Sequence, residues 1–111
     1  VPMCICTATD RPLVECALKR LGLLGYFSKI FTCSEVGHGK DQPDIYRQAL
    51  HWLGTPKART AVFEDALYAA RTAKADGFPI AAVYDRFEPG QAQLHALADW
   101  FFPEYPAELP F

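Results

Sequence analysis

The chain has 111 residues, of which 50% are hydrophobic, and its formal net charge is −2. This length predicts one domain or part of one, with enough apolar residues to form a core. The slightly acidic balance and the scattered lysines and arginines argue against nucleic acid as a partner. No apolar run approaches the roughly 20 residues that a membrane span needs, and no signal peptide is recognised.

The chain starts at Val1 and not at Met, as a processed or truncated product would. Along it, short apolar runs alternate with segments whose apolar residues have helical spacing. The expected elements are, in chain order, a strand at 3–7, a helix capped by Thr9 or Asp10 and ended by Gly22 or Gly25, a strand at 29–33, a loop at 34–42, a helix at 43–53, a strand at 60–64, a helix at 66–75, a strand at 79–84, a helix at 91–98 and a short edge strand at 99–102. Residues 103–111 hold three prolines and are expected to form an irregular tail.

Apolar side chains mark the faces that we expect to be packed. They are Leu13, Ala17, Leu18 and Leu21 in the first helix and Ile45, Tyr46, Ala49, Leu50 and Leu53 in the second. The aromatic residues Trp52, Trp100, Phe101, Phe102, Tyr105 and Phe111 are expected to pack in the core or the tail, and not to form a binding platform. The cysteines Cys4, Cys6, Cys16 and Cys33 fit no disulfide or zinc pattern, which predicts buried, reduced thiols in a cytoplasmic protein.

Strand–helix alternation with nearly continuous apolar strands predicts an α/β fold: a Rossmann-like parallel sheet with helices on both faces. Ligands in such sheets bind outside the carboxyl ends of the strands. The predicted strand ends carry hydroxyls and carboxylates at 7–9, 33–35, 64–65 and 84–85. A binding site is therefore expected at this rim of the sheet.

Three short segments at this rim carry candidate site residues. The hydroxyl of Thr7 and the N–H groups of Ala8 and Thr9 suit phosphate oxygens; the alternative is a strand end followed by a helix cap. Lys40 precedes a helix and can neutralise charge between a phosphate and a carboxylate, although most loop lysines only face water. The pair Glu64 and Asp65 suits Mg²⁺, which takes one or two carboxylates with waters and phosphate; the alternative is that Asp65 only caps the next helix.

Two further acidic residues, Asp85 and Glu88, are weaker candidates, and Asp85 is expected to start a turn.

The segments CICTAT (4–9), GKDQPD (39–44) and VFED (62–65) resemble the second, third and fourth motifs of the haloacid dehalogenase superfamily, in its phosphatase and β-phosphoglucomutase-like branch. The intervening LLGYFSKIF (23–31) and the stretch FEDALYAARTAKADGFPIAAVYD (63–85) are also similar to that family.

The resemblance implies a role for each segment. Thr7, with Ala8, would bind the transferring phosphoryl group, Lys40 would neutralise the nucleophile and the phosphate, and Asp65 with Glu64 would hold Mg²⁺. The substrate would be a small phosphorylated metabolite, and the family's nucleophile is an Asp that forms an aspartyl-phosphate.

Two features depart from the family pattern. Asp41 stands where the family commonly has Pro, beside Lys40. The chain also lacks the Asp-x-Asp motif, its central strand and the cap domain, so it would be a partial core, residues 1–111, without a nucleophile. The strands at 3–7 and 60–64 would then each have an unpaired edge, filled by a missing N-terminal segment or a second copy, or removed by direct pairing.

These features predict the C-terminal part of a Mg²⁺-dependent phosphatase or phosphomutase, inactive as an isolated chain. The alternative is a non-catalytic remnant of the family that serves as a binding or assembly module. A receiver-like or nucleotide-binding domain is disfavoured, because the sequence has no glycine-rich phosphate loop.

Overall fold

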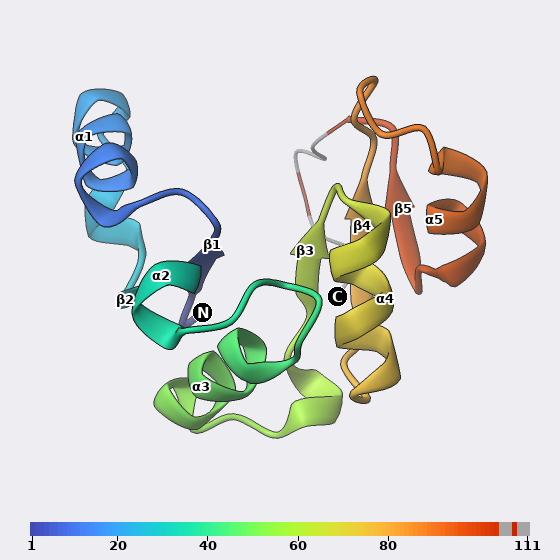
Figure 1. The fold of residues 1–111 in the computed structure, drawn as a ribbon, viewed down its shortest axis with the longest axis horizontal. Helices are drawn as coiled ribbons and strands as arrows, with labels where there is room; N and C mark the ends of the chain where they lie inside the picture. The colour runs from blue at the N-terminus through green and yellow to red at the C-terminus, as the bar shows by residue number, and fades with distance from the viewer. Residues whose placement is uncertain (105–107, 109–111) are drawn as a thin grey trace. The chain divides into compact units, whose positions relative to one another are not determined.

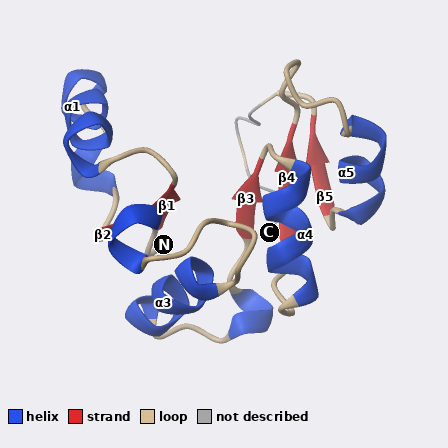
Figure 2. Cartoon of the chain, viewed as in Figure 1, coloured by secondary structure: helices blue, strands red, loops and turns tan. Residues whose placement is uncertain are grey.

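The computed structural model describes residues 1–104 and 108, and it divides the chain into two compact units, Val1–Thr55 and Pro56–Phe111. Both units are built from strands and helices that alternate along the chain (Figures 1 and 2). The expected residues Tyr105 and Phe111, and most of the expected tail, lie outside the described residues. No helix in the described part of the chain is long and apolar enough to cross a membrane.

The first unit holds a pair of parallel strands. Its elements are β1 (Cys4–Thr7), α1 (Arg11–Leu21), the 3-10 turn η1 (Leu24–Tyr26), β2 (Lys29–Thr32), α2 (Cys33–Val36) and α3 (Asp44–Leu53). The register pairs Cys4 with Lys29 and Thr7 with Thr32. Pro12 lies in the first turn of α1 as expected, and Gly22 ends that helix in the left-handed conformation, at φ 71°.

The second unit holds a three-stranded parallel sheet. Its elements are the 3-10 turn η2 (Lys57–Arg59), β3 (Val62–Glu64), α4 (Leu67–Ala75), β4 (Ile80–Val83), α5 (Gln91–Leu97) and β5 (Trp100–Phe102). The strand β4 lies in the middle, with β3 and β5 as its parallel neighbours. The helices α4 and α5 contact each other beside this sheet (Figure 1).

The predicted α/β class with parallel strands is therefore confirmed. Within the described residues, the first unit holds the strand order β1-β2 and the second holds β3-β4-β5. Among the described residues, β1 pairs only with β2, and β3 pairs only with β4. β1 and β3 lie in different units, so their direct pairing, one of the three expected outcomes, stays a prediction.

The expected apolar face of α3 is confirmed, whereas that of α1 is mostly wrong. Ile45 and Tyr46 are almost fully buried, but Leu13 and Leu21 are 66% and 68% exposed. Two strands lie about 4.8 Å apart, so the sheet of this unit is too narrow to cover a helix of 10–12 Å diameter. Leu18 is the buried residue of α1.

The loop expected at 34–42 begins instead with the short helix α2. Thr32 ends β2 and caps this helix, because its hydroxyl oxygen accepts a hydrogen bond from the Glu35 N–H at 3.2 Å. Gly37, at φ 91°, then ends the helix in the left-handed region. Cys33 is therefore the first residue of α2, and the prediction that it ends the preceding strand is wrong.

The cysteines are free, as predicted, but the expectation that they are buried is wrong. Cys16 is exposed on α1, and the other three are half-buried. Cys4 and Cys6 belong to β1, in which every residue is half-buried. The prediction that the aromatic residues pack in the core holds only in part. Trp52 is 52% exposed, whereas the three aromatic residues of β5 are half-buried.

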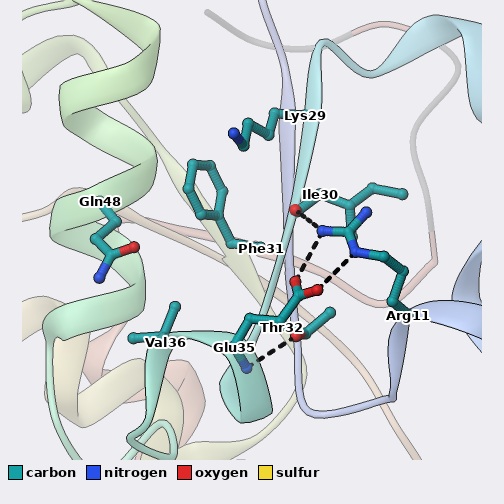
Figure 3. Close-up of a pocket in the computed structure, with 8 residues that line it drawn as sticks. All are labelled: Arg11, Lys29, Ile30, Phe31, Thr32, Glu35, Val36 and Gln48. Atoms are coloured by element: carbon teal, nitrogen blue, oxygen red, sulfur yellow. Dashed lines mark hydrogen bonds and ion pairs between the residues drawn. The ribbon is translucent and has the colours of Figure 1, made fainter.

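An ion pair joins the start of α1 to α2 around the edge of β2. The guanidinium of Arg11 donates from Nε and Nη2 to the carboxylate of Glu35, both at 2.8 Å, and Nη2 also donates to the Ile30 carbonyl at 2.7 Å. Figure 3 shows Arg11 on one side of β2 and Gln48 of α3 on the other.

We expect the Glu35→Gln variant to be less stable than the parent protein at neutral pH, with a smaller difference in stability near pH 2. The bonds from Arg11, with a further one from Thr32, lower the pKa of Glu35 from 4.5 to about 2. A lowered carboxyl pKa stabilises the fold fully above the ordinary value, and this contribution is lost as the pH falls from 4.5 to 2. The effect is small, because both side chains are partly exposed and water screens the pair.

Urea unfolding of both proteins at pH 7 and at pH 2 measures how much this difference shrinks. Lys19→Met, at the exposed end of α1, is the control. An equal gap between parent and variant at both pH values would contradict the assignment.

Candidate functional site

Thr7 is the last residue of β1, at the carboxyl end where the site is expected. Its hydroxyl oxygen accepts a hydrogen bond from the Thr9 N–H at 3.0 Å, which leaves its O–H hydrogen available to donate. The N-cap of α1 is Asp10, whose side chain makes no capping bond and accepts from the Ser34 hydroxyl at 2.8 Å. Thr7 therefore ends the strand and Asp10 occupies the N-cap position, as the alternative reading expects, and the exposed turn at Ala8 follows Thr7 directly.

Lys40 lies in the loop before α3 in the same unit as Thr7. Its ammonium is 6.0 Å from the centre of the Tyr46 ring, and the residue is half-buried. The helix that follows packs on β1, where the Cys6 thiol donates to the Ile45 carbonyl at 3.7 Å. The fold thus connects the loop of Lys40, through the first turn of α3, to the strand that carries Thr7.

Asp41, the departure beside Lys40, lies close to Gly39. A Cβ atom added at Gly39 would be 3.0 Å from the Asp41 carboxylate oxygen. The carboxylate therefore lies over the glycine backbone, and a side chain at position 39 would displace it.

Glu64 and Asp65 stand at the carboxyl end of β3, and their exposures differ. Glu64 is the last residue of the strand and only 7% exposed, whereas Asp65 is exposed in the bend that follows. The N-cap of α4 is Ala66, and the N–H of Leu67 is bonded to Glu88. The alternative reading of Asp65 as the cap of this helix is therefore wrong.

The donor set of these two carboxylates fits a hard cation such as Mg²⁺, which prefers oxygen ligands and keeps several waters. Among the described residues there is no group of three or more His, Cys, Asp or Glu side chains that could hold a metal ion. A site built here would thus use one or two carboxylates, with Asp65 as the accessible one.

Asp85 starts a turn, as predicted. Its side chain accepts from the Phe87 N–H at 2.9 Å, and its carbonyl accepts from the Glu88 N–H at 3.0 Å. The carbonyl of Asp85 also accepts from the amide of Gln91 at 2.7 Å. These bonds fix the loop between β4 and α5.

The predicted site residues fall in two groups. Thr7, Ala8 and Lys40 belong to the first unit, and Glu64 and Asp65 belong to the second. That the two groups form one site stays a prediction. A separate hollow of about 330 Å³ beside β2 is lined by none of them (Figure 3). Arg11, which lines it, already donates to Glu15, Glu35 and Ile30.

The sequence matches the family described as haloacid dehalogenase-like hydrolase over residues 1–77. The chain therefore belongs to this family. The match includes the three motif segments and both groups of predicted site residues, so the recognised resemblance is confirmed.

Relatives of known activity lie in the phosphatase branch of the family. The chain is 32% identical to fructose-1-phosphate phosphatase YqaB of Escherichia coli (strain K12) over 68% of its own length and 40% of the relative. It is 30% identical to a phosphorylated carbohydrates phosphatase of Thermotoga maritima, over 86% of its own length and 45% of the relative.

A solved structure agrees with these relatives. A variant of CbbY from Rhodobacter sphaeroides, in complex with xylulose-(1,5)bisphosphate, matches 94% of the chain with a TM-score of 0.81 and 28% identity. The match covers 47% of the CbbY chain. The chain thus spans less than half the length of the relatives that it matches.

Proposed function

We propose that this chain is the part of a Mg²⁺-dependent phosphatase or phosphomutase that holds the phosphate and the metal, and that the intact enzyme acts on a small phosphorylated sugar. The observation that carries the proposal is the order of the three motif segments at strand ends and ahead of α3. The substrate class is supported by the names of the two phosphatase relatives.

Each site residue has a role in this proposal. The O–H of Thr7 and the N–H of Ala8 donate to phosphate oxygens. The ammonium of Lys40 neutralises negative charge between the phosphate and the attacking carboxylate. Asp65, with the buried Glu64 beside it, holds Mg²⁺, which supplies charge stabilisation on the phosphoryl oxygens when bound.

The nucleophile itself comes from outside these 111 residues, because the sequence contains no Asp-x-Asp. A strand that carries it, in a preceding segment of the same protein, would pair with the open edges of β1 and β3. A second copy of this chain could fill those edges instead, but it would bring no nucleophile. Light scattering separates these routes, since completion by a second copy requires a stable oligomer of the chain. The four free cysteines favour a reducing compartment, and we place the protein in the cytoplasm.

A second candidate follows from the missing Asp-x-Asp, which favours a non-catalytic member of the family. In that case the chain is a binding or assembly module, and the open strand edges are its contact surfaces. A compact, stable oligomer without phosphatase activity is then expected.

Hydrolysis of p-nitrophenyl phosphate in the presence of Mg²⁺ tests the main proposal. We expect no turnover by the 111-residue chain, because the covalent route requires the nucleophile. The chain joined to a segment with Asp-x-Asp is expected to turn over, to stop with a chelator and to recover with added Mg²⁺. Turnover by the short chain would refute the proposal, and a longer protein that never turns over would favour the non-catalytic module.

A further inference from the structure

Glu88, in the loop between β4 and α5, reaches across to the start of α4. One carboxylate oxygen accepts a hydrogen bond from the N–H of Leu67, and the other accepts from the N–H of Gly90 at 3.0 Å. Leu67 is the first residue of α4, so Glu88 supplies the cap that Ala66 cannot. A carboxylate at this end of a helix is also favoured by the helix dipole.

The same loop holds Leu67 by its side chain. A Cβ atom added at Gly90 would lie only 2.5 Å from Cδ2 of Leu67. Gly90 is buried, so the leucine packs directly on the glycine backbone. Leu67 is thus held at its N–H by Glu88 and at its side chain by Gly90.

We infer that Glu88 is a positioning residue for the metal-binding turn, because the residue that it holds is only two positions after Asp65. The turn from Glu64 to Leu67 is short, and both its ends are fixed, one by β3 and the other by the contacts of Leu67. Asp65 is exposed between these anchors. The orientation of its carboxylate toward a cation therefore depends on Glu88, which lies 21 residues after Leu67 in the chain.

The inference rests on the proposed role of Asp65 as a metal ligand. The electrostatics around Glu88 agree with the contacts: the bonds from Gly90 and Leu67, with a smaller contribution from the charge of Arg71, lower the pKa of Glu88. Glu88 is therefore ionised at neutral pH and accepts both bonds as a carboxylate.

A metal titration followed by two-dimensional NMR of the 111-residue chain tests the inference. The variants are Glu88→Ala, which removes both acceptors, Glu88→Gln, which keeps one acceptor oxygen, and Glu104→Gln, an exposed control. In the parent chain we expect Mg²⁺ to shift the amide signals of residues 65–67. In Glu88→Ala we expect faster amide exchange at Leu67 and an affinity for Mg²⁺ about 10-fold weaker, as for other residues that orient metal ligands.

The graded series separates positioning from a general loss of stability. Glu88→Gln should be intermediate in both readouts, while Glu104→Gln should match the parent. Parent-like exchange and affinity in Glu88→Ala would overturn the inference. If Mg²⁺ shifts no amide signal of the parent chain, the proposed metal role of Asp65 fails. Amide exchange at Leu67 then tests separately whether Glu88 holds the turn. Faster exchange in Glu88→Ala would support this hold, and unchanged exchange would overturn it.

Discussion

We expect Lys40→Met to lower kcat by about 10²–10³-fold in an active form of the protein, the chain joined to the segment that carries the nucleophile. In the proposed function the Lys40 ammonium lies between a phosphate and a carboxylate, whose like charges repel in the ground state. Methionine keeps the length and the apolar part of the side chain but removes the charge. The loss should appear mainly in kcat, because charge builds up on the phosphoryl oxygens as the reaction proceeds.

Steady-state hydrolysis of p-nitrophenyl phosphate measures this effect. Lys19→Met, at the exposed end of α1, is the matched control and should leave kcat unchanged. Circular dichroism shows whether the variant is folded. A folded Lys40→Met protein with parental kcat would remove Lys40 from the proposed machinery.

We expect Ile80→Ala to destabilise the second unit by about 3–4 kcal/mol. Ile80 is fully buried in β4, the central strand of the three-stranded sheet. Its removal leaves a cavity among side chains that are packed from both neighbouring strands. Small domains are stable by only about 5–15 kcal/mol, so this loss is a large part of the whole.

The two tryptophans allow the measurement to be made for each unit. Trp52 belongs to α3 and Trp100 to β5. In a Trp52→Phe background, urea unfolding followed by fluorescence reports on Trp100 alone. Phe87→Ala removes an exposed side chain of the same unit and should change stability by no more than about 0.5 kcal/mol. An equally small change for Ile80→Ala would contradict its place in the core.

The order and type of the main elements could be predicted, because apolar spacing is a local property of the sequence. The strands at β1 and β4 and the helix α3 are apolar in the pattern that their burial requires. The helix α2 was not predicted, since it depends on the cap at Thr32 and the left-handed Gly37. The exposure of Leu13 could not be predicted either, because it follows from the narrow sheet beside α1.

The site could be predicted in part. Thr7, Lys40 and Asp65 stand out because each follows an apolar run or precedes a helix. Such positions can be recognised from the sequence alone. Glu88 carried no comparable signal: its partner Leu67 is 21 residues away, and only the folded loop brings them together. A carboxylate that acts through a backbone N–H leaves no motif in the sequence.

The strand pairing has a consequence for how the protein folds. Every pair joins nearby segments: Cys4 pairs with Lys29, Val62 with Ile80, and Ala81 with Trp100. The contact order of the sheets is therefore low for parallel strands, and chains with local contacts fold quickly. Each unit is continuous in sequence, so residues 1–55 leave the ribosome before residues 56–111 and can begin to form their contacts while the second unit is still being synthesised.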